Sequence, residues 1–320
     1  MRRVGSLLDG GSQTRNSRIA VFFIFWLVVL SAAAGGAGAL GAQSSSAIPS
    51  THNPSNCNQD GPPTGSAKDF ECARFVNPTR IDNKWLPLRP GTRFVYEGSA
   101  IVEGDGRQSR RVVSTVTDLT KVIAGVRTLV ILENDYTAGR LGETELAFFA
   151  QDREGNVWRL GEYPEEYEDG KFVGAPTWIA GLRGARAGIA MPAHPRLRAP
   201  SYAAGFAPPP VDFKDRARTY KVGQRTCVPV GCYENVLVTE EFERGVPGAY
   251  QLKYYAPHVG NVRVGWRGEQ EEERETLELV DYRHLSPEAL AKVRKAAMEL
   301  DKRARGRSKV YRQTPPVEPL

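Results

Sequence analysis

Residues 143–169 contain the densest group of side chains that could carry chemistry in this chain. Nine acidic residues lie there, against only Arg153 and Arg159. Carboxylates in such numbers serve as general acids and bases, or as oxygen ligands for calcium. The same composition is typical of a β-hairpin with acids along a solvated edge. The elements that carry these residues therefore decide between the interpretations.

The stretch FFAQDREGNVWRLGEY, residues 148–163, favours a hairpin. Asp152 at the first position and Gly155 at the fourth match a type I turn, in which glycine adopts a positive φ without steric cost. Asn156 begins a second segment of alternating polar and apolar residues. We therefore predict that Asp152, Gly155 and Asn156 form a hairpin turn, and that the Asp152 side chain caps its own backbone rather than a metal.

Calcium is the weaker alternative at this turn, and no other cofactor or metal is predicted. Calcium takes about six to eight oxygen ligands, usually from acids at alternate positions. Only Asp152 and Glu154 qualify locally, so the segment PEEYEDG at 164–170 would have to supply the others from across the sheet.

A pair of carboxylates is the alternative for an enzyme. Glu143 or Glu145 together with Glu162 would form that pair, because a sheet can bring together acids that are distant in sequence. Acids opposite each other across a hairpin are, however, common on exposed faces. Strand alternation also places two sets of side chains on opposite sides of the first strand: Glu145, Ala147 and Phe149 against Leu146, Phe148 and Ala150.

Nucleophilic catalysis has little support. A serine or cysteine nucleophile needs a histidine and an orienting acid, and the histidines are scattered at positions 52, 194, 258 and 284. The sequence contains no Gly-x-Ser-x-Gly elbow, no phosphate-binding glycine loop and no His-Glu-x-x-His zinc motif. No catalytic or ligand-binding residue is therefore assigned.

The N-terminus predicts export. Residues 1–18 carry four arginines against one aspartate, and residues 19–42 are uncharged and end in small residues. A basic start, an apolar middle and a small-residue exit describe a signal peptide. The uncharged run is also long enough to span a bilayer, which takes roughly 20 residues. Residues 1–42 are therefore interpreted as a signal peptide, with a transmembrane anchor that contacts the membrane as the alternative. In either case the chain is predicted to be exported, to the periplasm or the extracellular space, and to be secreted after cleavage or tethered by residues 19–42.

Four cysteines agree with export, since disulfides persist in oxidising compartments. The two pairings that are local in sequence, Cys57 with Cys72 and Cys227 with Cys232, are the most economical of the three possible. Neither spacing fits a zinc site.

The net charge of +6 does not predict a nucleic-acid partner. Residues 1–18 carry +3 and residues 292–312 carry +7, so the rest of the chain is net negative. A nucleic-acid footprint should lie on the folded face. The basic C-terminal tail is interpreted as a solvated extension, with contact to an anionic membrane or cell wall as the alternative.

The chain divides into four parts. After residues 1–42 comes a Ser/Pro/Asn/Gly-rich linker at 43–69, which is expected to be loosely ordered. Residues 70–285 form a β domain, because segments such as RRVVSTVTDL and VRTLVILENDY alternate with a period of two between Gly, Pro and Asp turns. This pattern predicts a mainly β fold, with an antiparallel curved sheet as a half-barrel or sandwich. Residues 286–320 form a basic helix and tail.

The C-terminal helix has clear start signals. Ser286 is placed to cap it and Pro287 suits its first position. Its apolar stripe is narrow, so weak docking is expected.

Within the β domain, many of the aromatic residues could gather on the concave side of a curved sheet, although most such residues fill cores. The Gly/Ala-rich segment WIAGLRGARAGIAMP is expected to cross the sheet as a long loop, with its small residues allowing close approach of backbone.

Five blocks, in chain order, carry a resemblance: PLRPGTRFVYEG, TVTDLTKVIAGVRTLVI, AQDREGNVWRLGE, GLRGARAGIAMPAHP and KYYAPHVGNVRV. They resemble a family of exported bacterial proteins of unknown function, over roughly residues 70–280. The opening Pro-Gly-Thr-x-x-x-Tyr and the closing Tyr-x-Ala-Pro-x-x-Gly-x-Val are more distantly similar to curved-sheet envelope proteins, including lipoprotein carriers of the LolA and LppX sort. That similarity implies a lipid-holding half-barrel, but this chain lacks a lipobox cysteine.

Three classes of function follow. The first is binding of an apolar or lipid-like ligand or of an envelope component. The second is carboxylate-dependent hydrolysis, with or without calcium. The third is a structural envelope module without a small ligand. An open apolar cavity favours the first, convergent acids with perturbed protonation the second, and a closed aromatic interior the third.

Overall fold

The computed structural model describes residues 62–102 and 106–320. The signal peptide, most of the linker and Cys57 lie outside these residues. The transmembrane prediction is corrected: no helix in the described residues is long and apolar enough to cross a membrane. Residues 19–42, which suggested the anchor, lie outside the described part of the chain.

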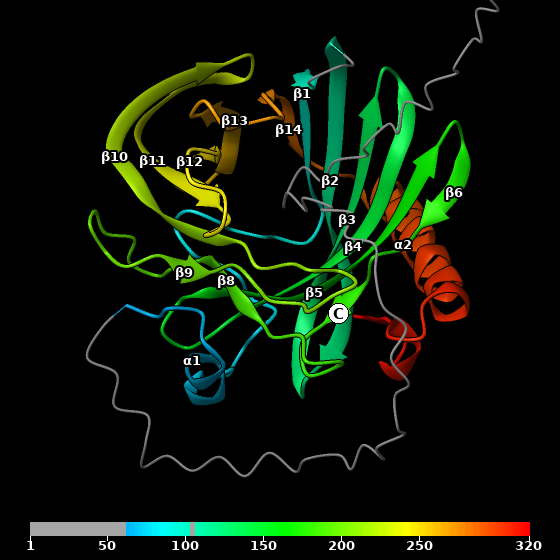
Figure 1. Ribbon diagram of the computed structural model, residues 1–320. Helices are drawn as coiled ribbons and strands as arrows, with labels where there is room; N and C mark the ends of the chain where they lie inside the picture. Colours follow the sequence, from blue (N-terminus) through cyan, green and yellow to red (C-terminus); the bar gives the residue numbers. More distant parts are fainter. Residues whose placement is uncertain (1–61, 103–105) are drawn as a thin grey trace, which may run out of the picture.

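The described residues form one large antiparallel sheet that curves into an open half-barrel (Figure 1). Neighbouring strands follow the order β6-β5-β4-β3-β2-β1-β14-β13-β12-β11-β10-β9. The prediction of a mainly β, antiparallel, curved sheet is confirmed, as a half-barrel rather than a sandwich. The strands are β1 (Thr92–Val102), β2 (Gly106–Ile123), β3 (Val126–Thr137), β4 (Arg140–Gln151), β5 (Val157–Glu168), β6 (Lys171–Gly174), β7 (Trp178–Ile179), β8 (Gly188–Met191), β9 (Tyr202–Ala203), β10 (Arg216–Val228), β11 (Gly231–Phe242), β12 (Tyr250–Ala256), β13 (Gly260–Arg267), β14 (Thr276–His284) and β15 (Glu318–Pro319).

The curvature is strongest where the pairing is irregular. Between β10 and β11 the register shifts three times, from Thr219 to Thr226. Each extra residue bends its strand and increases the local twist. These two strands curl over the open side of the sheet at the left of Figure 1 and face the β2–β5 half across the concavity. The concave side of the sheet is called the inner face below.

Helix α2 (Pro287–Arg307) packs against the outer side of β2 and β4. The Ser286 side chain caps it by accepting a hydrogen bond from the Ala289 amide. Ala297, Leu300 and Ala304 are buried against the sheet. The expectation of weak docking was wrong, because small residues let the helix approach closely and ion pairs extend the narrow apolar stripe.

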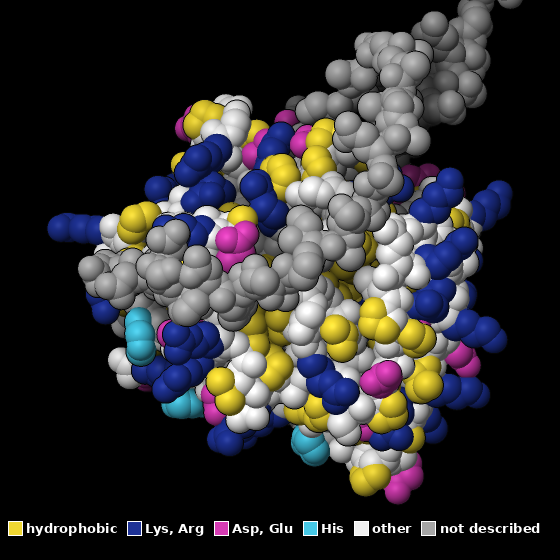
Figure 2. Space-filling view, turned by 90° about the horizontal axis from the view of Figure 1, so that it is seen from below, with side chains coloured by type: hydrophobic (Ala, Val, Ile, Leu, Met, Phe, Trp, Pro, Cys, Tyr) yellow, Lys and Arg dark blue, Asp and Glu magenta, His cyan; other side chains and the backbone are white. Residues whose placement is uncertain are grey.

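The C-terminal tail also packs on the sheet. After α2, Tyr311 in a short 3-10 helix (Tyr311–Gln313) is fully buried. β15 then pairs with β2 through Glu318 and Thr120. The interpretation as a solvated extension is therefore corrected. Lys and Arg side chains do gather on the molecule's right margin in Figure 2, the side on which α2 lies in Figure 1.

Residues 174–213 close one end of the sheet. β7 and β8 pair with β5, and Arg186 bridges to Phe206. A Cβ at Gly188 would lie 2.2 Å from the Gly205 amide nitrogen, so only glycine allows this close passage. The sequence predicted that the Gly/Ala-rich segment approaches other backbone closely, and Gly188 does so. The segment was expected to be a long loop, but it contains the short strands β7 and β8.

A second crossing segment, residues 81–88, is called the strap. Ile81 and Leu88 bridge to each other at its ends. Asn83 anchors it: its side-chain amide donates to the Gly155 and Pro192 carbonyls at 2.8 and 3.2 Å. Its side-chain oxygen also accepts hydrogen bonds from the strap's own backbone. The strap is therefore fixed against the ends of β4, β5 and β8.

Candidate functional site

The inner face of β3, β4 and β5 carries a buried network of charged side chains. Both faces of β4 are covered, so alternation does not separate buried from exposed residues there. Leu146, Phe148 and Ala150 belong to the core under α2, while Ala147 and Phe149 belong to the core of the inner face. The interpretation of the acids as a solvated edge was wrong for five acids of this region, which are buried: Glu143, Glu145, Asp152, Glu162 and Glu165.

Arg159 brings together two of the acids proposed as a catalytic pair. Its guanidinium lies 2.9 Å from Glu145 Oε1 and also contacts Glu162. All three side chains are nearly inaccessible to solvent. Because a cation is shared between the two acids, the arrangement is an ion-paired triad rather than two free carboxylates.

Like charges also face each other across β3 and β4. Glu133 is registered directly opposite Glu145, and Asp135 opposite Glu143. Such cross-strand pairs are destabilising when both members are ionised. Burial, reinforced by the Glu145 charge, raises the pKa of Glu133 and of Glu143 well above the ordinary value. The shift favours the protonated form of both carboxyls.

Further buried charges come from both halves of the sheet. On β11 and β12, Lys253 Nζ lies 2.7 Å from Glu241 Oε2, and both are buried. On β2, Arg110 lies 2.6 Å from Asp135. Burial raises the pKa of Asp135 to about 7, although Arg110 opposes the shift.

A pocket of about 50 Å³ opens onto this network and is called the inner pocket. The apolar part of its lining, called the rim below, includes Leu86 and Leu88 of the strap with Phe94 and Phe149. The charged part of its lining, called the floor below, consists of Glu133, Glu145, Arg159, Glu241 and Lys253. The arrangement combines an apolar wall with buried groups that donate, accept and hold protons.

Asn261 adds an acceptor to this pocket. Its backbone carbonyl accepts a 2.9 Å hydrogen bond from the Tyr96 hydroxyl. Its side-chain Oδ1 is buried and has no hydrogen-bond partner among the residues that the structure describes. Buried amide oxygens are normally paired, so this atom is available to a donor on a bound molecule.

Sequence reasoning found part of this network and missed the rest. Glu143, Glu145 and Glu162 were the predicted pair, but Glu133, Glu241 and Lys253 were not singled out. The signal was present, since ILENDY and VLVTEEFE place acids inside strands that are otherwise apolar. A charged residue within such a strand indicates either an exposed face or a buried polar site, and the sequence does not distinguish the two.

The predicted hairpin turn lies at residues 152–156. The Gly155 amide donates to the Asp152 carbonyl at 3.1 Å, and Gly155 has a φ of +92°. The Asp152 carboxylate accepts from the Asn156 amide, the Asn156 side chain and the Trp158 indole, at 2.8, 2.9 and 2.8 Å. These donors occupy the carboxylate that a calcium ion would need. No group of three or more His, Cys, Asp or Glu within residues 62–102 and 106–320 is placed to hold a metal.

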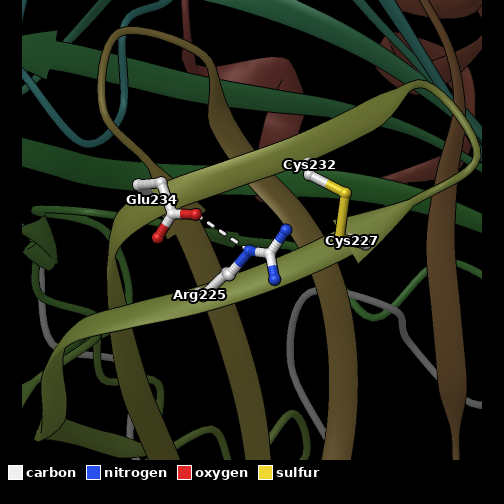
Figure 3. Close-up of a disulfide and its surroundings, with 4 residues drawn as sticks. All are labelled: Arg225, Cys227, Cys232 and Glu234. Atoms are coloured by element: carbon white, nitrogen blue, oxygen red, sulfur yellow. Dashed lines mark ion pairs between the residues drawn. A yellow bond between two sulfur atoms is a disulfide. The ribbon is translucent and has the colours of Figure 1, made fainter.

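The predicted disulfide between Cys227 and Cys232 is confirmed (Figure 3), with an S–S distance of 2.04 Å. It joins β10 to β11 near the tip of their hairpin. The exposed ion pair of Arg225 and Glu234, at 2.8 Å, lies beside it. Cys72 lies at the end of helix α1 (Ala67–Cys72), whereas Cys57 is outside the described residues, so their pairing stays a prediction.

No protein-family model and no curated protein matches this chain. Two crystal structures are similar to it. One is of a "putative exported protein with YmcC-like fold" from Bacteroides fragilis, with 11% identity, a TM-score of 0.38 and coverage of 63% of this chain and 99% of that one. The other is of a "putative lipoprotein" from Parabacteroides distasonis, with 10% identity, a TM-score of 0.35 and coverage of 63% and 100%. The similarity to LolA and LppX carriers stays a prediction, and neither match bears on the site of this chain.

Proposed function

We propose that this chain is an exported binding protein that holds a small amphipathic molecule in the inner pocket. Export is supported by the order of basic, apolar and small residues in 1–42, and by the Cys227–Cys232 disulfide. The observation that carries the binding proposal is that one pocket is lined both by an apolar rim and by a buried charged floor. Small-molecule sites typically combine an apolar lining with a few convergent polar groups.

The chemistry of the floor specifies the polar end of the ligand. Asn261 Oδ1 needs a donor, and Glu133, with its raised pKa, offers a carboxyl that donates or accepts. A hydroxyl or amide group satisfies both. The apolar body of the same molecule packs against Leu86, Phe94 and Phe149. The ligand class is therefore a neutral molecule with an apolar body and a hydrogen-bonding head.

The size of the pocket excludes a whole lipid chain in the closed arrangement. A volume of about 50 Å³ holds only a few atoms. In this proposal the strap moves to admit a larger ligand, because Leu86, Pro87 and Leu88 form one wall. Asn83, which anchors the strap, controls that movement.

The test uses 1-hexanol, which has an apolar body and one hydroxyl, in an NMR titration of the exported protein. Saturable shifts confined to the strap and to β3, β4 and β12 are expected. Leu86→Glu places a charge at the rim and should weaken binding at least tenfold. The matched control is Leu197→Glu at a leucine that is 49% exposed, which should bind as the wild type does. Equal binding by wild type and Leu86→Glu, or no saturable binding by the wild type, rejects the proposal.

Carboxylate-dependent hydrolysis is a second candidate, favoured by the Glu133–Glu145 juxtaposition. Burial raises the pKa of Glu133 well above its ordinary value and also raises that of Glu145, where the Arg159 charge opposes the shift. Two carboxyls whose pKa values differ can divide the roles of acid and base. Chromogenic glycosides and esters provide the assay. Glu133→Gln should abolish any hydrolysis, while Glu97→Gln, at an exposed glutamate of β1, should retain it. Activity that survives Glu133→Gln would exclude this candidate.

A further inference from the structure

A second pocket lies beside the inner pocket, at the ends of β11 and β12, and is called the acidic pocket. Its volume is about 180 Å³. Five of its lining residues are acids: Asp215, Glu241, Glu243, Glu271 and Glu272. It shares only Glu241 with the inner pocket, so the two are separate sites joined at one residue.

Asp215 distinguishes this pocket from an ordinary acidic surface. Its side chain lines the pocket, and the residue is only 6% exposed. Its carbonyl accepts a hydrogen bond from Ala204, but its carboxylate has no hydrogen bond or ion pair to any residue that the structure describes. Burial raises the pKa of Asp215 well above the ordinary value; the charges of Glu241 and Glu243 add to the shift, and those of Lys253 and Arg159 oppose it. A carboxyl that is buried without a partner is costly.

The neighbouring acids are already engaged. Glu241 pairs with Lys253 at 2.7 Å, and Glu243 pairs with Lys214 at 2.9 Å. Glu271 Oε1 accepts the Glu273 amide at 3.3 Å. Lys253 and Lys214 therefore form their ion pairs with carboxylates other than Asp215. Asp215 is left as the carboxyl with which a bound cation would pair.

The walls favour an organic cation over a metal ion. Phe242, Val246 and Ala249 form an apolar side of the pocket. A metal ion would need several ligands converging on one point, and no such group of three occurs in the described ranges 62–102 and 106–320. An alkylammonium or guanidinium group instead needs one close carboxylate and an apolar surface for its stem.

We propose that the acidic pocket binds an organic cation, with its ammonium or guanidinium group against the Asp215 carboxylate and its apolar stem along Phe242 and Val246. The cation comes either from a free amine or from a lysine side chain of a peptide. This site is independent of the proposed ligand of the inner pocket.

The test is isothermal titration calorimetry of the exported protein with two probes, n-butylammonium chloride and Nα-acetyl-lysine methylamide. Saturable binding of the first identifies a free amine, and tighter binding of the second identifies a peptide side chain. Asp215→Asn should weaken either probe at least tenfold. Glu234→Gln, at an exposed acid whose side chain is 68% accessible, is the matched control and should bind as the wild type does.

Asp215→Asn keeps the shape of the side chain and removes a buried ionisable group, so its melting temperature at neutral pH should equal or exceed that of the wild type. Loss of binding then does not reflect unfolding. Ala249→Phe fills the pocket but keeps every acid, and it should also abolish binding. Unchanged affinity in either variant, absence of saturation by both probes, or displacement of both probes by micromolar calcium overturns the proposal.

Discussion

The two faces of β4 are both buried, but they carry different kinds of side chain. Toward α2, Leu146 and Phe148 pack in an apolar core. Toward the inner face, Glu145 lies among buried acids that oppose one another across β3 and β4. The same strand thus serves a packed core on one side and a charged cavity on the other.

The charges on the α2 face are fewer and fully engaged. Lys121 Nζ lies 2.9 Å from Asp301 and also donates to the Pro315 carbonyl. Its ammonium is 4.1 Å from the centre of the Tyr311 ring. On the inner face, by contrast, Glu143 Oε2 and Asn261 Oδ1 have no hydrogen-bond partner among the described residues. Satisfied groups stabilise a fold, whereas unsatisfied buried groups are typical of a site that binds something.

The largest effect is expected from breaking the inner network at Arg159. Arg159→Met leaves Glu145 and Glu162 buried without their shared cation, which should lower the free energy of unfolding by about 3–5 kcal/mol. Urea denaturation at pH 7 measures it. Arg225→Met, in an exposed ion pair, is the control and should cost less than about 1 kcal/mol. A loss as small as the control's would show that the network contributes no stability.

The α2 face should respond to loss of volume rather than charge. Leu300→Ala removes a buried side chain that is 1% exposed, and should cost about 2–4 kcal/mol because a cavity remains. Met298→Ala, at a methionine that is 44% exposed, should have little effect. Binding of 1-hexanol should be unchanged in both variants. Loss of binding in folded Leu300→Ala would show that the two faces are not independent.

The hairpin turn should depend on hydrogen bonds and not on calcium. Asp152→Ala removes the acceptor of three hydrogen bonds and should cost about 1–3 kcal/mol, since the Trp158 indole loses its partner. Thermal melting of the wild type with EDTA and with added calcium should give one melting temperature. A rise with calcium that disappears in Asp152→Ala would restore the calcium alternative.

The pH dependence of stability should also come from the inner face. Asp135 holds its proton to a pKa of about 7 in the folded state, against 3.8 as its ordinary value. Between these values the folded state binds more protons, so the free energy of unfolding should fall as pH rises, by at most about 1.4 kcal/mol per pH unit from this group. The charged groups around it are Arg110, Glu133, Glu143, Glu273 and Glu275.

Asp135→Asn removes this titration and should make the fall less steep, as measured by urea denaturation at pH 5, 6 and 7. Glu97→Gln, at an exposed acid, should leave the slope unchanged. Identical slopes in wild type and Asp135→Asn would mean that Asp135 is ionised throughout this range.

The features that the sequence predicted correctly are local. The start of α2 after Ser286 follows from a cap and a proline that lie next to each other in the chain. The Cys227–Cys232 disulfide spans a hairpin tip, so neighbouring residues determine it. The antiparallel sheet follows from alternating segments between turn residues, because each strand pairs mostly with the next one along the chain.

The burial of the acids depended on the tertiary structure alone. Alternation assigned Glu145 to one side of its strand and Phe148 to the other, and that assignment was right. It could not show that α2 covers one side while β11 and β12 face the other from about a hundred residues away. A side chain is exposed or buried according to what covers its face, and that cover comes from distant segments. The sequence therefore determined the strands, the turn and the local disulfide, whereas only the folded sheet made a charged cavity from residues that looked like a solvated edge.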